Sequence, residues 1–80
     1  MTDFQRLNFI LRGNFIGLDA LLKATGLAES GGRARHLIDE GLVRVDGLSE
    51  QRRTCKIRAG QTVQIHGACI FIQPPEPISS

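Results

Sequence analysis

Basic side chains gather at two places in the middle of the chain. Arg33 and Arg35 follow two glycines in ESGGRARHLIDEG (29–41), and a second group lies between positions 52 and 58. Residues 33–58 hold seven cations against the four acids Asp39, Glu40, Asp46 and Glu50; the cations are Arg33, Arg35, Arg44, Arg52, Arg53, Lys56 and Arg58. Residues 51–75 contain no acid, so the net charge of +2 understates this segregation. The pattern favours a polyanionic partner.

The glycines at 31 and 32 follow Ser30, a good N-cap residue. The first N–H groups of a helix have no partner within the helix and carry the positive end of its dipole. Glycines leave those groups open to the close approach of an anion such as phosphate. Arg33 and Arg35 would then supply charge beside the same helix end. Two interpretations stay open here: an anion contact, or a tight turn followed by solvated arginines.

The remaining reactive side chains form no catalytic or metal-binding pattern. Cys55 and Cys69 with His36 and His66 could supply four zinc ligands, but no pair has the close spacing of a zinc finger. The histidines lack an evident partner for general-base work, and Ser30 is better explained as a helix cap. Cys55, beside Lys56, is weak evidence for a lowered thiol pKa. We predict no enzymatic activity, no metal and no cofactor, with both thiols reduced and structural.

The composition is typical of one small globular domain. Eighty residues with 41% hydrophobic content allow a single modest core. No apolar run approaches the roughly 20 residues that span a bilayer, and Asp3 and Arg6 stand where a signal peptide would be apolar. Trp and Tyr are absent and the four Phe lie toward the two ends, so a single-strand binder with aromatic platforms is poorly supported. We expect a cytoplasmic monomer with no membrane partner.

The first half of the chain reads as a strand followed by two helices. RLNFIL (6–11) alternates weakly and predicts a strand with Leu7, Phe9 and Leu11 on one side. GLDALLKATG (17–26) has leucines at helical spacing and a glycine that can end the helix. A second helix begins at Ser30 and ends before Gly41, with an apolar stripe of Ala34, Leu37 and Ile38. On this helix we expect an ion pair between Arg35 and Asp39.

The second half reads as short strands. Val43 and Val45 alternate around Arg44 before the turn signal Asp46-Gly47, and the polar stretch LSEQRRTCK (48–56) follows. Further strands are expected at Ile57, at Val63 and Ile65, and at Ile70 and Ile72. The tail QPPEPISS (73–80) should stay outside the sheet because of its prolines. The predicted class is α+β, two short helices packed on a small antiparallel sheet. Residues 1–5 would be a flexible N-terminus, 6–73 one domain and 74–80 a flexible Pro-rich tail.

The order of these features resembles the RNA-binding domain named after ribosomal protein S-four, which has the alpha-L motif. The resemblance covers residues 18–65 and rests on LDALLKATGLAESGGRARHLIDEGLVRVDG and KIRAGQTVQI. The matching positions are Leu21-Leu22, Gly26-Leu27, Ser30, Ala34-Arg35, Leu37-Ile38, the run GLVRVDG (41–47) and Gly60 before Thr62-Val63. The combination of ESG, VDG, CKI and AGQTV is closer still to the small stand-alone bacterial members typified by YbcJ.

The resemblance implies a compact module that binds structured RNA, with ribosomal RNA as the family-level expectation. Arg35 matches the basic residue of the family's second helix, and Lys23 matches a basic site on the first. Arg52, Arg53 and Lys56 match the basic loop of the YbcJ type. In two departures, Gly31 stands where many members have Arg after Ser, and Gln61 replaces the Asp after Gly60. The first means that one phosphate contact is absent or has moved to Arg33; the second affects the turn.

The loop that carries Arg52, Arg53 and Lys56 follows a strand that begins just after the second helix. Chain continuity lets this loop fold back beside the helix, so that both basic groups form one surface. Recognition would then depend on RNA phosphates, 2′-hydroxyls and shape. The full set of RNA-binding candidates is Lys23, Ser30, Gly31, Gly32, Arg33, Arg35, Arg44, Arg52, Arg53, Lys56 and Arg58.

Two other function classes remain open. LLKATGLAESGGRARHLIDEG (21–41) can be read as a helix-turn-helix DNA binder in which Arg33 and Arg35 contact bases, but the basic loop would then have no role. A protein-interaction or ribosome-assembly adaptor would dock the basic face on an acidic protein. The first rival predicts a preference for DNA, and the second predicts binding that survives nuclease treatment.

Overall fold

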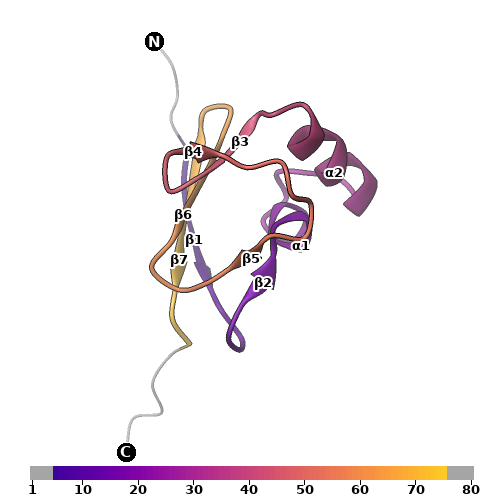
Figure 1. Cartoon of the computed structure of the whole chain (residues 1–80). Coiled ribbons are helices and arrows are strands. Elements are labelled where there is room, and N and C mark those ends of the chain that lie inside the picture. The colour runs from indigo at the N-terminus through magenta and orange to yellow at the C-terminus, as the bar shows by residue number, and fades with distance from the viewer. Residues whose placement is uncertain (1–4, 76–80) are drawn as a thin grey trace, which may run out of the picture.

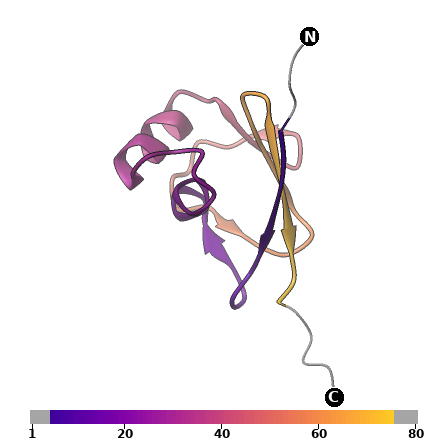
Figure 2. The ribbon, with the colours of Figure 1, turned by 180° about the vertical axis from the view of Figure 1, so that it is seen from behind.

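The computed structural model describes residues 5–75, which form one sheet, a small β-ribbon and two helices (Figure 1). The elements in chain order are β1 (Gln5–Ile10), β2 (Ile16–Gly17), α1 (Leu18–Ala24), α2 (Gly31–Asp39), β3 (Val43–Val45), β4 (Leu48–Ser49), β5 (Lys56–Ile57), β6 (Thr62–Ile65) and β7 (Ala68–Gln73). The helices and the β-ribbon lie on one side of the sheet, as the front and back views both show (Figures 1 and 2). The expected α+β class is confirmed.

The main sheet has the strand order β1-β7-β6-β3-β4. Its β3–β4, β3–β6 and β6–β7 pairs are antiparallel, as expected. The β1–β7 pair is parallel, which corrects the expectation of a purely antiparallel sheet. Parallel strands need a long crossover, and here the chain between the two strands supplies it. A second, two-stranded sheet pairs β2 with β5 in antiparallel register.

The core lies between the helices and the inner face of the sheet. Leu18, Leu21 and Leu22 of α1 are fully buried. On α2 the expected stripe of Ala34, Leu37 and Ile38 is also buried. Each fully buried aliphatic side chain contributes about 1.5–3 kcal/mol to folding. Because α1 has only seven residues, this packing, rather than its own helical tendency, holds it in place.

Both ends of α2 follow the sequence signals. Ser30 is the N-cap, and its Oγ accepts a hydrogen bond from the Arg33 amide at 3.1 Å. Gly41 follows the C-cap residue Glu40 with a φ of 76°, the left-handed conformation that glycine adopts most easily. The turn after β3 is also as expected, with Asp46 and Gly47 both at positive φ.

Short segments differ from the expectations. β2 and β4 have two residues each and were not expected as strands; two residues are too few to show an alternating pattern. β1 begins at Gln5, inside the segment expected to be flexible, and Gln73 of the expected tail pairs with Ile10. Pro74 and Pro75 lie outside the strands, as expected. Residues 1–4 and 76–80 lie outside the described residues.

The outer face of the sheet carries no helix (Figures 1 and 2). Strand register aligns Arg6, Cys69, Gln64 and Arg44 across this face, and Asn8, Phe71 and Thr62 form the next row. Arg44 is exposed between the buried Val43 and Val45, so its side chain points away from the helices. The molecule therefore has a helical side and a helix-free side, with different basic residues on each.

Candidate nucleic-acid interface

The loop between β4 and β5, residues 50–55, is called the basic loop below because it carries Arg52 and Arg53. Its backbone caps α1, whose N-cap residue Gly17 has no side chain to do so. The Leu18 amide donates to the Cys55 carbonyl at 2.9 Å, and the Asp19 amide donates to the Arg53 carbonyl at 3.1 Å. These bonds satisfy amides that no residue within the helix can reach. The basic loop is thus fixed to the start of α1.

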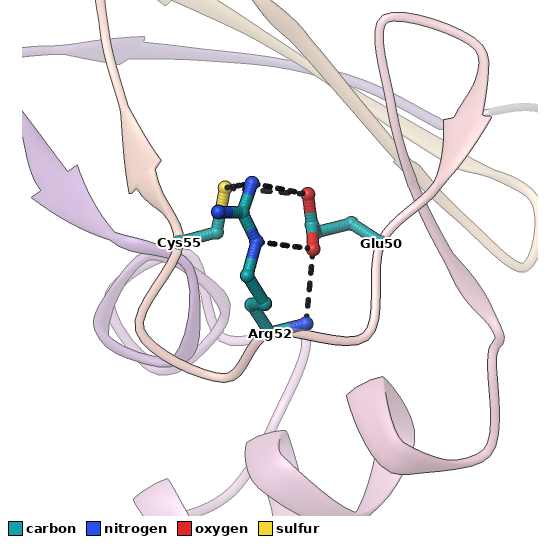
Figure 3. Close-up of polar contacts among 3 residues, drawn as sticks. All are labelled: Glu50, Arg52 and Cys55. Carbon is teal, nitrogen blue, oxygen red and sulfur yellow. Dashed lines mark hydrogen bonds and ion pairs between the residues drawn. The ribbon is translucent and has the colours of Figure 1, made fainter.

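Glu50 holds Arg52 within the basic loop (Figure 3). The Arg52 amide, Nε and Nη2 donate to the Glu50 carboxylate at 3.0, 3.1 and 3.3 Å. The Glu50 side chain is only 18% exposed, whereas that of Arg52 is 79% exposed. The hydrogen bonds from Arg52 lower the pKa of Glu50 to about 2. The carboxylate therefore stays charged under ordinary conditions and fixes a guanidinium that faces solvent.

Arg53 ties the basic loop to α2. Its Nε and Nη2 donate to the Asp39 carboxylate at 3.0 and 2.5 Å, and these bonds lower the pKa of Asp39. The expected ion pair of Arg35 with Asp39 is therefore wrong, because Asp39 bonds to Arg53. Arg35 instead donates its Nε to the Gly31 carbonyl at 3.2 Å. Gly32, Arg35, His36, Asp39 and Arg53 line one shallow hollow.

The start of α2 remains sterically open at its glycines. A Cβ added to Gly31 would lie 3.6 Å from Arg35 Nη2, and one added to Gly32 would lie 3.9 Å from Ser30 Oγ. Both are ordinary van der Waals distances, so the fold does not require glycine at either position for space. Neither residue has a positive φ. The need for a tight left-handed turn therefore does not explain these glycines.

The other candidates lie in several places. Lys23 is exposed in the last turn of α1. Arg44 lies on the helix-free side, in register with Ser49, the residue that precedes the basic loop. Lys56 begins β5 and Arg58 follows that strand; both lie over the ring of Phe15. The structure thus brings Gly32, Arg35 and Arg53 together around one hollow. Ser30, Gly31 and Arg33 belong to the first turn of the same helix, and Arg52 and Lys56 line a separate hollow.

Two expectations about reactive groups are corrected. Burial and a hydrogen bond to Glu50 raise the pKa of the Cys55 thiol, which had been a weak candidate for a lowered value. His36 has a partner after all, since its Nε2 lies 2.6 Å from Glu40 Oε1. Cys55 and Cys69 are both free thiols.

The described residues, 5–75, contain no group of three His, Cys, Asp or Glu side chains placed to hold a metal ion. Within the same residues, no helix is long and apolar enough to cross a membrane.

A family model described as the S4 domain matches residues 9–73, which extends the resemblance beyond positions 18–65 at both ends. The chain belongs to the S4 domain family. Over 52 residues it is 55% identical to YbcJ of Escherichia coli (strain K12), which is named a candidate RNA-binding protein. That match covers 65% of this chain and 74% of YbcJ. The Shigella flexneri protein YbcJ, named as uncharacterized, matches to the same extent.

The solution structure of YbcJ from E. coli has a TM-score of 0.66 to this chain at 43% identity. The likeness covers 82% of this chain and 85% of that one. The YbcJ structure is described as revealing an alpha-L motif involved in RNA binding. The expected membership in the S4 family, the YbcJ resemblance and the alpha-L fold are confirmed.

Sequence reasoning missed the residues that hold the arginines. Glu50 counted only as an acid that offsets the basic charge, Asp39 was expected to pair with Arg35, and Phe15 had no role. For Glu50 a signal was available, because a carboxylate two residues before an arginine in a loop can accept from both its amide and its side chain. For Asp39 no local signal exists, since Arg53 lies fourteen residues away.

Proposed function

We propose that this protein binds structured RNA through the helical side, with the basic loop and the start of α2 as its contact surface. The observation that supports this most directly is the Arg53–Asp39 contact, which fastens the basic loop beside α2. Membership in the S4 family and the similarity to YbcJ support the same assignment.

The charge on this surface suits the phosphate backbone. Arg52 and Arg53 use Nε and Nη2 for their carboxylates, so the Nη1 groups take no part in those bonds and are available to phosphate oxygens. Guanidinium groups are well matched to phosphate geometry. Arg33, Arg35 and the open amides at Gly31 and Gly32 would contact a neighbouring phosphate.

Recognition of structured RNA through its backbone fits this arrangement better than the reading of base edges in a groove. The deep groove of an A-form helix excludes side chains, so recognition depends on phosphates, 2′-hydroxyls and shape. Fixed arginines favour such recognition because they keep a set spacing. The proposal covers ribosomal RNA as the target class, a non-catalytic monomer and the cytoplasm as its compartment, where free thiols persist.

The test is a fluorescence anisotropy titration of a labelled RNA hairpin and of the DNA hairpin of the same sequence, at about 50 and 200 mM salt. We expect tighter binding to RNA and an affinity that falls steeply with salt. Equal, weak binding to both hairpins would show that the surface attracts any nucleic acid by charge alone, and would overturn the proposal. Absence of binding to either at low salt would also overturn it and would favour the adaptor function with a protein partner.

A further inference from the structure

Phe15 lies beside two cations that are distant from it in the sequence. It immediately precedes β2, and β2 pairs with β5 so that Ile16 faces Ile57 and Gly17 faces Lys56. Lys56 Nζ lies 4.9 Å from the centroid of the Phe15 ring, and Arg58 Cζ lies 6.0 Å from it. Both distances are typical of cation–π contacts. Phe15 is nevertheless 46% exposed, so much of the residue remains open to a ligand.

An apolar hollow adjoins Phe15. Residues lining it include Phe9, Ile10, Leu11, Arg12, Phe15 and Ile16, and no acidic side chain of the described residues takes part. Ile10 is 52% exposed, so the hollow presents an aliphatic side chain to solvent. The site thus combines a flat aromatic ring and an apolar wall with Arg12, Lys56 and Arg58. A ligand that carries a planar group and an anion would complement this site, because the planar group can stack on the ring and the anion can contact the cations.

We propose that Phe15, with Lys56 and Arg58, is a stacking site for one unpaired base of the bound RNA. This inference rests on the proposed function, because Lys56 directly follows the basic loop and joins the two surfaces. A base within a duplex is already stacked on both sides, so only an unpaired nucleotide can reach the ring. Lys56 and Arg58 would contact its phosphates, and stacking on an aromatic ring is tolerant of base identity.

The experiment compares a blunt RNA hairpin with the same hairpin carrying a short single-stranded extension that contains 2-aminopurine. The extension should tighten binding by about tenfold, as expected for one stacked base, and the fluorescence of 2-aminopurine should fall on binding. Phe15→Ala and Phe15→Leu should both abolish the gain while leaving affinity for the blunt hairpin within about twofold. Phe15→Trp should restore it. Since Phe15 is half exposed, these variants should fold, which circular dichroism checks.

Phe71 offers a matched control, because its side chain is also exposed, by 37%, but lies on strand β7 on the helix-free side. Phe71→Ala should keep the whole gain from the extension. A blunt hairpin that binds with no gain from the extension, or a gain that survives Phe15→Ala, would overturn the stacking site alone. Failure of both hairpins to bind would overturn the proposed function as well.

Discussion

The two basic groups of the helical side differ in how their arginines are held. In the basic loop, Arg52 and Arg53 each bond to a carboxylate through Nε and Nη2. At the start of α2, the Arg35 side chain bonds only to the Gly31 carbonyl, and within residues 5–75 the Arg33 side chain makes no hydrogen bond. One group is therefore held by carboxylates before any ligand arrives, and the other is not.

Each arrangement has a cost for binding a phosphate. An arginine that no carboxylate holds loses side-chain freedom when a phosphate orders it, at a cost of up to about 2 kcal/mol. An arginine held by a carboxylate has lost that freedom already, but its partner's negative charge weakens the attraction of a phosphate. The basic loop thus favours defined geometry, and the start of α2 favours plain electrostatic attraction.

The largest expected effect separates the two groups directly. Arg52→Ala with Arg53→Ala should lower RNA affinity by about a hundredfold, because it removes two charge-assisted contacts and leaves Glu50 and Asp39 facing the phosphates. Arg33→Ala with Arg35→Ala should lower RNA affinity by about tenfold, since side chains that must be ordered on binding contribute less net free energy. Each pair should reduce the salt slope by up to about two units. Anisotropy titrations at several salt concentrations measure both quantities.

Arg6 and Arg44 provide the matched control for these variants. They lie on the helix-free side, so Arg6→Ala with Arg44→Ala removes the same charge and should change affinity by less than about threefold. A loss as large as that of the loop pair would instead group Arg44 with the contact surface.

A smaller effect comes from removing the acid that holds Arg53. Asp39→Asn keeps the shape of the side chain and removes a negative charge from the hollow that also contains Arg35. We expect RNA affinity to rise by about fivefold at low salt, and the gain to shrink at high salt, where screening is stronger. Glu40→Gln, a neighbouring acid that pairs with His36, should have little effect. A loss of affinity in Asp39→Asn would mean that positioning outweighs charge at Arg53.

Glu50 should behave in the opposite way, because its carboxylate is mostly covered and positions Arg52. Glu50→Gln is expected to lower RNA affinity by about threefold, less than the loss of a whole charge-assisted bond, because the Gln side chain still accepts a hydrogen bond from Arg52. The substitution also has a pH signature. The pKa of Glu50 is about 2 in the folded protein against an ordinary 4.5, so its stabilisation is complete above about pH 4.5 and is lost as the pH falls toward 2.

Urea unfolding of the two proteins between pH 7 and 2 measures this signature. The difference in free energy of unfolding between wild type and Glu50→Gln should shrink steadily below about pH 4.5. A difference that stays constant down to pH 2 would show that the Glu50–Arg52 contact does not stabilise the folded state.

The smallest effect concerns the glycines at the start of α2. Gly31→Ala and Gly32→Ala should each raise the free energy of unfolding by about 0.5–1 kcal/mol, because alanine is the better helix former. The added methyl groups have space. If a phosphate approaches the amides, RNA affinity should nevertheless fall, by about twofold. A rise in stability with unchanged affinity would show that these glycines take no part in RNA binding.

The sequence could predict features that depend on nearby residues better than contacts between distant ones. The span of α2 followed from Ser30, Gly41 and a buried stripe, because caps and helical periodicity act over a few residues. The placement of both basic groups on one side was also predictable from the short path between them. In contrast, the Arg35–Asp39 pair was wrong because helical spacing makes a contact possible without deciding which of two arginines forms it.

Other features depend on long-range contacts that no local pattern encodes. The parallel direction of β1 depends on its pairing with β7 at the far end of the chain. The raised pKa of Cys55 reflects burial beside Glu50. In the sequence, only the adjacent Lys56 was evident, and it suggested a lowered pKa. The β2–β5 ribbon places Phe15 beside Lys56 and Arg58. Its strands have two residues each, which is too short for a sequence pattern to predict them.

The most direct test of the contact surface is NMR of 15N-labelled protein, following backbone amides and arginine Nε–Hε groups as an RNA hairpin is added. The surface proposed here predicts that signals of Gly31, Gly32, Arg33, Arg35, Arg52 and Arg53 shift together, while those of Arg6 and Arg44 stay in place. Shifts confined to Arg6, Arg44 and the outer rows of the sheet would contradict it, because the RNA would then lie on the helix-free side.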